Sequence, residues 1–358
     1  MYEKYFGLAS NPFSMTPDPS MLFMTPTHRE ALAGLAYAIL ERKGFVALTG
    51  EAGTGKTSLL ARTLTVLPKT RVVSSVILNP SLTANEFIEM MLLDFGFRDF
   101  SESKARRLVM FQEFLLKTQS VGQIAVLVVD EAHKMSPPLL EEVRLLSNLE
   151  FPGTKLLQIV LAGQPELIDV LNRPDLRQLN QRVSVRLSIG LLKPSEVPHY
   201  IALRWSKSAS APPPFSEASY GEIASWSRGI PRLVNSICDN ALMLAFAETS
   251  REVHPSHVRE ASKDLSLADP SSSDRGARHY YGAAHAGATL RPGMVGAANG
   301  VTANGVPAHS GMAVSEVEEG PVRQAAPLRV PSPVADAKPS FWQRWMGRRR
   351  EAPAEEVR

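Results

Sequence analysis

The segment GEAGTGKT, at residues 50–57, limits the folds open to this chain more than any other stretch. It matches the pattern G-x-x-x-x-G-K-[ST], and it lies between the β-type run FVALT and the helix-forming run SLLARTLTVL. A strand, a glycine-rich loop and a helix in this order direct backbone N–H groups and the positive end of a helix dipole at one anion. The segment therefore predicts a phosphate-binding loop within an α/β fold, in preference to a glycine-rich loop of chance origin.

The residue types in this loop suit ATP with Mg²⁺. Glycines let the loop curl so that its N–H groups face a phosphate, and Lys56 places a point charge on the β and γ phosphates. The Thr57 hydroxyl is a predicted ligand of Mg²⁺. The predicted nucleotide-binding residues are Gly50, Glu51, Ala52, Gly53, Thr54, Gly55, Lys56, Thr57 and Ser58.

A second motif, VLVVDEAH at residues 126–133, predicts the groups that act on the nucleotide. A buried strand that ends in Asp-Glu places two carboxylates at the edge of the sheet where the phosphate loop lies. We expect Asp130 to hold Mg²⁺ through its waters and Glu131 to orient and polarise the attacking water. An acidic pair at the surface is the alternative. Two roles are open for His133: it can couple the state of the nucleotide to neighbours, or it can be structural.

Polar and basic residues further along the chain are candidates for completing the site. Gln164 follows the next buried strand, where its side chain can reach the γ-phosphate or the water, and Asn148 is the poorer alternative. Arg177 and Arg182 precede the last predicted strand, a position from which an arginine can neutralise the γ-phosphate of a neighbouring subunit. Arg232 lies in the first turn of a helix, where the dipole disfavours a cation, so we expect it to contact the phosphates.

Apolar segments that alternate with helical stretches continue to about residue 190. Runs such as AVLVV and LLQIVLA are apolar along almost their whole length, which is typical of strands buried on both faces of a parallel sheet. The sequence thus predicts a doubly wound α/β core. The expected strands are 45–48, 71–78, 125–129, 156–161 and 183–189. A helix is expected at 27–43, with Thr27 as its N-cap and Glu30 completing a capping box.

Changes in composition divide the chain into four expected parts. Residues 1–44 form an arm and a first helix packed on the core, and residues 45–190 form the nucleotide-binding core. Strand signals then stop, so residues 191–268 are expected to form a small all-helical lid. Residues 269–358 are rich in Ala, Gly, Pro, Ser and Val without periodicity, which predicts a disordered tail.

Charge and targeting signals limit the function classes. The formal net charge of +3 is too small to argue for nucleic acid by itself. The N-terminus lacks a signal-peptide pattern, and no stretch reaches the ~18 consecutive apolar residues that span a bilayer, so we expect a cytoplasmic protein. The single cysteine, Cys238, is expected to be buried on a helix. The segment FWQRWMGRRR, at 341–350, suits either a short peripheral anchor at the inner membrane or a solvated tail.

Taken in order, the motifs GEAGTGKT, VLVVDEAH, AGQPEL, LRQLNQR and GIPRLVN resemble those of the AAA+ superfamily. The opening YFGLASNPFSMTPDPSMLFMTPTHREAL is similar to that of the general secretion pathway protein A (ExeA) group of bacterial ATPases. That group also includes pilus-biogenesis and exosortase- or exopolysaccharide-associated members, and the resemblance covers about residues 1–268. It implies a five-stranded αβα core with a helical lid, Walker A at 50–57, Walker B at Asp130 and Glu131, sensor 1 at Gln164 and sensor 2 at Arg232.

The resemblance also implies a function and partners. Members of the secretion group use ATP beside the envelope to help assemble a secretion pore. Many carry a transmembrane helix and a peptidoglycan-binding domain after the ATPase, and the tail here shows neither pattern. We therefore expect a homo-oligomeric ATPase that acts with envelope secretion or polysaccharide-export components.

The motifs are compatible with two other functions. A DNA-associated AAA+ ATPase, of the transposition or replication-initiation type, is the alternative, because relatives with similar motifs act there. No helix-turn-helix or basic stripe lies outside the ATPase region, so nucleic acid is the less expected partner. A regulatory switch that rarely hydrolyses ATP is the third, and the presence of Glu131 argues against it.

Overall fold

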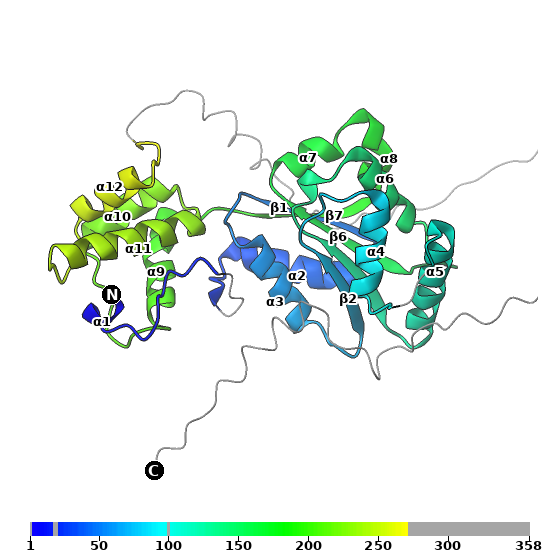
Figure 1. Ribbon diagram of the computed structural model, residues 1–358, viewed down its shortest axis with the longest axis horizontal. Helices are drawn as coiled ribbons and strands as arrows, with labels where there is room; N and C mark the ends of the chain where they lie inside the picture. The colour runs from blue at the N-terminus through cyan, green and yellow to red at the C-terminus, as the bar shows by residue number, and fades with distance from the viewer. Residues whose placement is uncertain (1, 17–20, 99–100, 271–358) are drawn as a thin grey trace, which may run out of the picture. The chain divides into compact units, whose positions relative to one another are not determined.

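Five parallel strands form the central sheet of this computed structural model, in the order β2-β3-β6-β1-β7 (Figure 1). The strands are β1 (Phe45–Gly50), β2 (Val72–Ile77), β3 (Ile124–Val129), β6 (Leu157–Gly163) and β7 (Val183–Ile189). The structure describes residues 2–16, 21–98 and 101–270. The predicted α/β fold with a parallel five-stranded sheet is confirmed.

Side chains alternate between the two faces of the sheet, and helices cover both faces. On β3, Val126 and Val128 pack in one cluster with α2 (Pro26–Leu40) and α3 (Lys56–Val66). Leu127, between them, packs in the cluster on the other face. The helices of that second face are α4 (Ala84–Asp94), α5 (Lys104–Ser120), α6 (Pro137–Leu146), α7 (Glu166–Leu171) and α8 (Arg177–Arg182). Burial on both sides explains why β3 is a continuous apolar run and why β1 and β6 are largely apolar.

The first long helix begins earlier than the sequence predicts. Its N-cap is Thr25, whose side chain accepts a hydrogen bond from the backbone N–H of His28, and Pro26 occupies the first turn. Proline suits that position because the first helical N–H groups have no partner within the helix. The predicted N-cap at Thr27 is therefore wrong. The Thr27 hydroxyl instead accepts a hydrogen bond from the backbone N–H of Gly190, at 3.2 Å.

Among the short elements that were not predicted are a hairpin and a helix. A hairpin of β4 (Glu150–Phe151) and β5 (Thr154–Lys155) connects α6 to β6, and the short helix α1 (Tyr2–Tyr5) opens the chain. Each strand of the hairpin has only two residues, which is too short for an alternating pattern to be visible in the sequence.

Four helices form the lid after the sheet: α9 (Val197–Trp205), α10 (Glu217–Ser227), α11 (Pro231–Ala247) and α12 (Pro255–Asp264). Their apolar sides meet in a cluster that includes Trp205, Ile223, Val234 and Val258. Cys238 lies on α11 within this cluster and is fully buried, and burial raises the pKa of its thiol. The prediction that this cysteine is a buried residue of a helix is confirmed.

The N-terminal arm packs in a different place from the one expected. α2 and the residues just before it pack against the sheet, whereas Tyr2, Leu8 and Phe13 belong to the apolar cluster of the lid. Arg204 of α9 donates hydrogen bonds to the carbonyl oxygens of Pro12, at 2.7 Å, and of Ser14. The apolar residues of the arm thus complete the core of a small helical domain.

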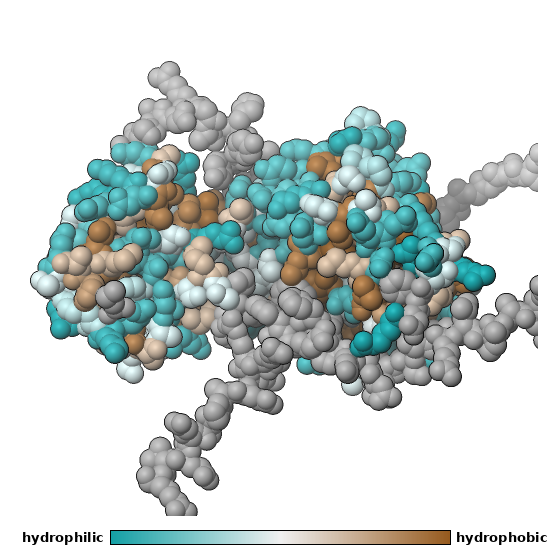
Figure 2. Space-filling view, viewed as in Figure 1, coloured by the Kyte–Doolittle hydropathy of each residue, from teal (hydrophilic) through white to brown (hydrophobic). Residues whose placement is uncertain are grey.

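Hydrophilic side chains cover most of the face drawn in Figure 2, with hydrophobic ones spread among them. None of the helices described between residues 2 and 270 combines the length and apolar character needed to span a bilayer. The predicted disordered tail and the segment 341–350 lie outside the described residues.

Candidate nucleotide site

The phosphate loop lies between the end of β1 and the start of α3, as the motif predicts. Gly53 and Gly55 have φ angles of 82° and 100°, in the left-handed region that favours glycine. A side chain at Gly53 would also collide with the lid, because its Cβ would lie 2.6 Å from the Cβ of Arg232. Gly53 is therefore needed both for the turn and for the close approach of α11.

Lys56 is held inside the loop. Its ammonium group donates hydrogen bonds to the carbonyl oxygens of Gly50, at 2.8 Å, and of Glu51, at 3.0 Å. Burial lowers the pKa of Lys56, and the carboxylates of Asp130 and Glu131 oppose that shift. The cation is thus held at the centre of the loop, beside the place where the motif predicts phosphate.

Thr57 and Asp130 meet although they come from different elements. The Thr57 hydroxyl donates a hydrogen bond to Asp130 Oδ2 at 2.5 Å, and Asp130 Oδ1 accepts the backbone N–H of Glu131 at 2.9 Å. Burial raises the pKa of Asp130, while these hydrogen bonds act in the opposite direction. A hydroxyl and a carboxylate are hard oxygen ligands, so the pair fits Mg²⁺.

A Mg²⁺ ion at this pair would take its other ligands from outside the protein. Among the described residues, no group of three or more His, Cys, Asp or Glu side chains could hold a metal ion. Mg²⁺ in phosphate-transfer sites is bound by one or two protein groups, with phosphate oxygens and water completing the octahedron. The donor set present therefore suits a magnesium–nucleotide complex and not a free metal site.

Glu131 adopts an unusual backbone conformation directly after β3. Its φ angle is 53°, which is rare for a residue with a side chain, and the short helix η2 (Ala132–Lys134) follows. Its carboxylate lies 3.4 Å from Lys134 Nζ and 3.5 Å from His133 Nε2. Strained backbone of this kind is often found at functional sites, where it aims a side chain.

Gln164 and His133 lie against each other because β3 and β6 are neighbours in the sheet. The backbone N–H of Gln164 donates to His133 Nδ1 at 3.3 Å, and the side-chain amide lies 3.3 Å from His133 Nε2. The His133 ring thus lies between Gln164 and the Glu131 carboxylate. A Cβ at Gly163 would lie 3.2 Å from His133 Nδ1, so this glycine leaves room for the ring.

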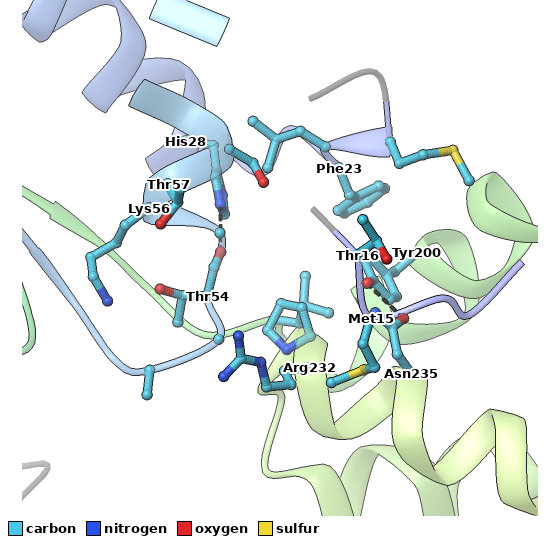
Figure 3. Close-up of a pocket in the computed structure, with 18 of the residues that line it drawn as sticks. Met15, Thr16, Phe23, His28, Thr54, Lys56, Thr57, Tyr200, Arg232 and Asn235 are labelled. Atoms are coloured by element: carbon cyan, nitrogen blue, oxygen red, sulfur yellow. Dashed lines mark hydrogen bonds between the residues drawn. The ribbon is translucent and has the colours of Figure 1, made fainter. Parts of the chain in front are cut away.

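The phosphate loop, Glu131 and Gln164 border one cavity of about 380 Å³, shown in Figure 3. Its polar wall is the phosphate loop with Glu131, Lys134 and Gln164. The wall contributed by the arm and the lid includes Met15, Phe23 and Tyr200. The rings of Phe23 and Tyr200 are 5.9 Å apart and nearly perpendicular. The volume lies in the range of small-molecule sites. The polar wall suits the phosphate end of a nucleotide, and the aromatic rings of the other wall suit its base.

The predicted site residues divide into two groups. The cavity brings together the loop residues 52–58 with Glu131, Gln164 and Arg232, while Asp130 lies directly behind Thr57. The sequence did not single out His28, Phe23, Tyr200, Arg204 and Asn235, which also line the cavity. Only Phe23 had a signal, the number of aromatic residues in the arm, which indicated an ordered segment without saying what it contacts.

The other predicted residues lie elsewhere. Asn148 is exposed beyond the end of α6 and does not line the cavity. Arg177 is exposed at the start of α8, and Arg182, at its end, donates a hydrogen bond to the hydroxyl of Ser147. Neither arginine reaches the cavity of its own subunit. Their predicted action on a neighbouring subunit therefore stays a prediction.

Comparison with known proteins agrees with this geometry. A family model described as an AAA domain matches residues 39–171. General secretion pathway protein A of Aeromonas hydrophila is 39% identical over 267 residues, which are 74% of this chain and 49% of the relative. The chain is an AAA+ ATPase of the general secretion pathway protein A type. This AAA+ ATPase spans about half the length of the curated relative that it matches.

Solved structures support the fold of the AAA+ ATPase. ORC2 of Aeropyrum pernix, in its ADPNP–ADP complexes, matches with a TM-score of 0.57 and 15% identity, over 74% of this chain and 73% of that chain. Cdc6p of Pyrobaculum aerophilum matches with a TM-score of 0.56 and 19% identity, over 72% of each chain. At such low identity, the similarity shows the shared fold alone.

Proposed function

We propose that this AAA+ ATPase hydrolyses Mg²⁺-ATP as a homo-oligomer and uses the energy to assemble or remodel an envelope secretion or polysaccharide-export machine. The observation that carries this proposal is the 39% identity to general secretion pathway protein A, which extends over 267 residues. That length exceeds the matched AAA domain of 39–171, so the similarity is not confined to the motifs that all such ATPases share.

Each group of the cavity has a role in the proposed hydrolysis. Lys56 and the loop N–H groups bind the phosphates, and Thr57 with Asp130 holds the magnesium ion, which supplies positive charge to the phosphate oxygens. Glu131 orients the attacking water and takes its proton. Gln164 holds the same water or the γ-phosphate, and Arg232 brings the lid onto the phosphates. Phe23 and Tyr200 offer an apolar surface to the adenine base.

The position of two arginines supports the proposed homo-oligomer. Arg177 and Arg182 are outside the cavity of their own subunit, and the proposal places one of them at the γ-phosphate of the next. Contact with secretion or export components would place the protein in the cytoplasm, at the inner face of the inner membrane.

The test is to replace the chromosomal gene with Lys56→Ala or Glu131→Gln and to measure exported proteins and surface polysaccharide. Both alleles should block export of one of these cargo classes while the cellular level of the protein stays at that of the wild type. Normal export by both alleles, together with lost ATPase activity in the purified variants, would refute the role in an export machine.

The export result for these variants, combined with a DNA-binding measurement, tests the DNA-associated alternative. Purified wild-type protein is mixed with duplex DNA, with and without Mg²⁺-ATP, over a series of salt concentrations. ATP-dependent binding that weakens steeply with salt, combined with normal export by the two alleles, would favour the DNA-associated alternative.

A further inference from the structure

His28 connects the first long helix to the phosphate loop. It lies on α2, outside the matched AAA domain, and only 2% of its surface is exposed. Its Nδ1 lies 2.6 Å from the Thr25 hydroxyl, and its Nε2 lies 3.0 Å from the carbonyl oxygen of Thr54. Figure 3 shows the ring beside the loop, between α2 and Thr54.

The partners of the ring fix its tautomer. A carbonyl oxygen can only accept, so Nε2 carries the proton and donates it to Thr54. Nδ1 then accepts the hydroxyl proton of Thr25, whose oxygen in turn accepts the backbone N–H of His28 at 3.3 Å. Burial lowers the pKa of His28, which favours this neutral form. The imidazole is therefore held in one orientation, with a single N–H aimed at the loop.

The hydrogen bond to Thr54 orients one peptide group of the loop. In a planar trans peptide, the C=O of Thr54 and the N–H of Gly55 point in opposite directions. His28 holds the carbonyl toward α2, so the Gly55 N–H points to the opposite side, away from α2. Glycines at φ 82° and 100° flank this segment, and they would otherwise allow the peptide plane to rotate at little cost.

We infer that His28 is a positioning residue for phosphate binding, which holds the Thr54–Gly55 peptide so that its N–H group faces the nucleotide. The inference rests on the proposed function, because it needs the loop to bind ATP. It adds a residue that the phosphate-loop motif does not contain. The competing explanation is that His28 is a satisfied buried histidine that stabilises the packing of α2 and nothing more.

Two variants of similar polarity separate these explanations. In His28→Gln the side-chain amide nitrogen can reach the position of Nε2 and donate to Thr54, whereas in His28→Asn it is too short to do so. The dissociation constants of ADP and of inorganic tripolyphosphate are measured by calorimetry for the wild type and both variants. Tripolyphosphate has no base, so its affinity reports the phosphate site and not the Phe23 and Tyr200 surface.

We expect His28→Asn to weaken the binding of both probes about tenfold, which corresponds to about 1.4 kcal/mol. His28→Gln should stay within about threefold of the wild type, a difference of less than 1 kcal/mol. His257→Asn is the matched control, because His257 is equally buried, at 2% exposure, in the lid. It should lower the melting temperature without changing either dissociation constant.

The possible failures are distinguishable. If the wild type binds neither ADP nor tripolyphosphate, the proposed function fails. If the wild type binds both and His28→Asn binds them as tightly, while its melting temperature falls like that of His257→Asn, then His28 is structural and only the positioning role is wrong. Equal loss of affinity in His28→Gln and His28→Asn would also overturn the positioning role, because the loss could then not be caused by the missing hydrogen bond to Thr54.

Discussion

The hydroxyl of Thr57 donates a hydrogen bond to Asp130 across 73 residues of sequence, and it joins the first turn of α3 to the end of β3. Both groups belong to the proposed magnesium site, and the hydrogen bond holds them beside each other. The arrangement has an energetic cost, because Asp130 is only 2% exposed and burial raises the pKa of its carboxyl group.

The first prediction concerns Asp130→Asn. Because the pKa of Asp130 in the folded protein lies above the ordinary value of 3.8, its contribution to stability is fully present below that value. The contribution is lost as the pH rises through the raised pKa. Without nucleotide, the variant should therefore melt at a higher temperature than the wild type at neutral pH, and the difference should shrink toward acidic pH. Its Mg²⁺-dependent ATPase rate should fall about 100-fold or more. A lower melting temperature at neutral pH would contradict the cost assigned to the buried charge.

Glu131→Gln tests the water-activating role. The amide keeps the size of the side chain but cannot take a proton, so we expect ATP to bind normally and to be hydrolysed about 100-fold more slowly or worse. Lys56→Ala is the comparison, because removal of the phosphate cation should weaken binding itself. Equilibrium binding and single-turnover hydrolysis separate the two effects. Loss of nucleotide affinity in Glu131→Gln would make this residue a metal ligand or a structural one.

A double-mutant cycle tests the contact between His133 and Gln164. If the two side chains act together on the water held by Glu131, His133→Ala and Gln164→Ala should each lower the turnover number, and the double variant should be little worse than either. KM should change by less than about threefold in all three, since the pair lies apart from Lys56. Additive losses in the double variant would show that the residues act independently.

Mixing experiments test the arginines. Arg182→Ala or Arg177→Ala should bind ATP normally and hydrolyse it slowly, and the activity per molecule of the wild type should rise with protein concentration. An equal mixture of the slow arginine variant with Lys56→Ala should recover about a quarter of the wild-type rate if subunits mix at random, because one interface in four then pairs an intact loop with an intact arginine. Arg182 must first leave Ser147 to act in this way. A mixture no more active than its parts would reject the residue tested.

A pH dependence follows from His28. Burial places its pKa in the folded protein below the ordinary value of 6.5, so its contribution to stability is present above pH 6.5. That contribution is lost as the pH falls from 6.5 through the lowered value, because the unfolded chain takes up the proton first. Melting temperatures of the wild type and of His28→Gln, measured between about pH 5 and pH 8, should converge at the acidic end. Parallel curves would exclude His28 as the titrating group.

The sequence predicted what depends on local pattern. The phosphate loop is recognisable because its glycines, Lys56 and Thr57 lie within one short stretch of sequence. The strand β3 is recognisable because it is apolar throughout and is followed directly by Asp-Glu. The sequence alone could not predict the contact between His133 and Gln164. That contact requires β3 and β6 to be adjacent in the sheet, and strand order has no local signal in the sequence. The contact of His28 with Thr54 was missed for the same reason, and the choice of Thr25 over Thr27 as N-cap turned on one proline.

The burial of Cys238 has a practical consequence. The thiolate is the reactive form, so a wholly buried thiol with a raised pKa should be inert to maleimides in the folded protein. No other cysteine is present in the chain. The native protein is thus already a suitable background for site-specific fluorophores. One cysteine introduced on the exposed surface of α5 and another on that of α12 would make a donor–acceptor pair, and the distance between core and lid could be followed through a nucleotide cycle with every native residue of the cavity in place.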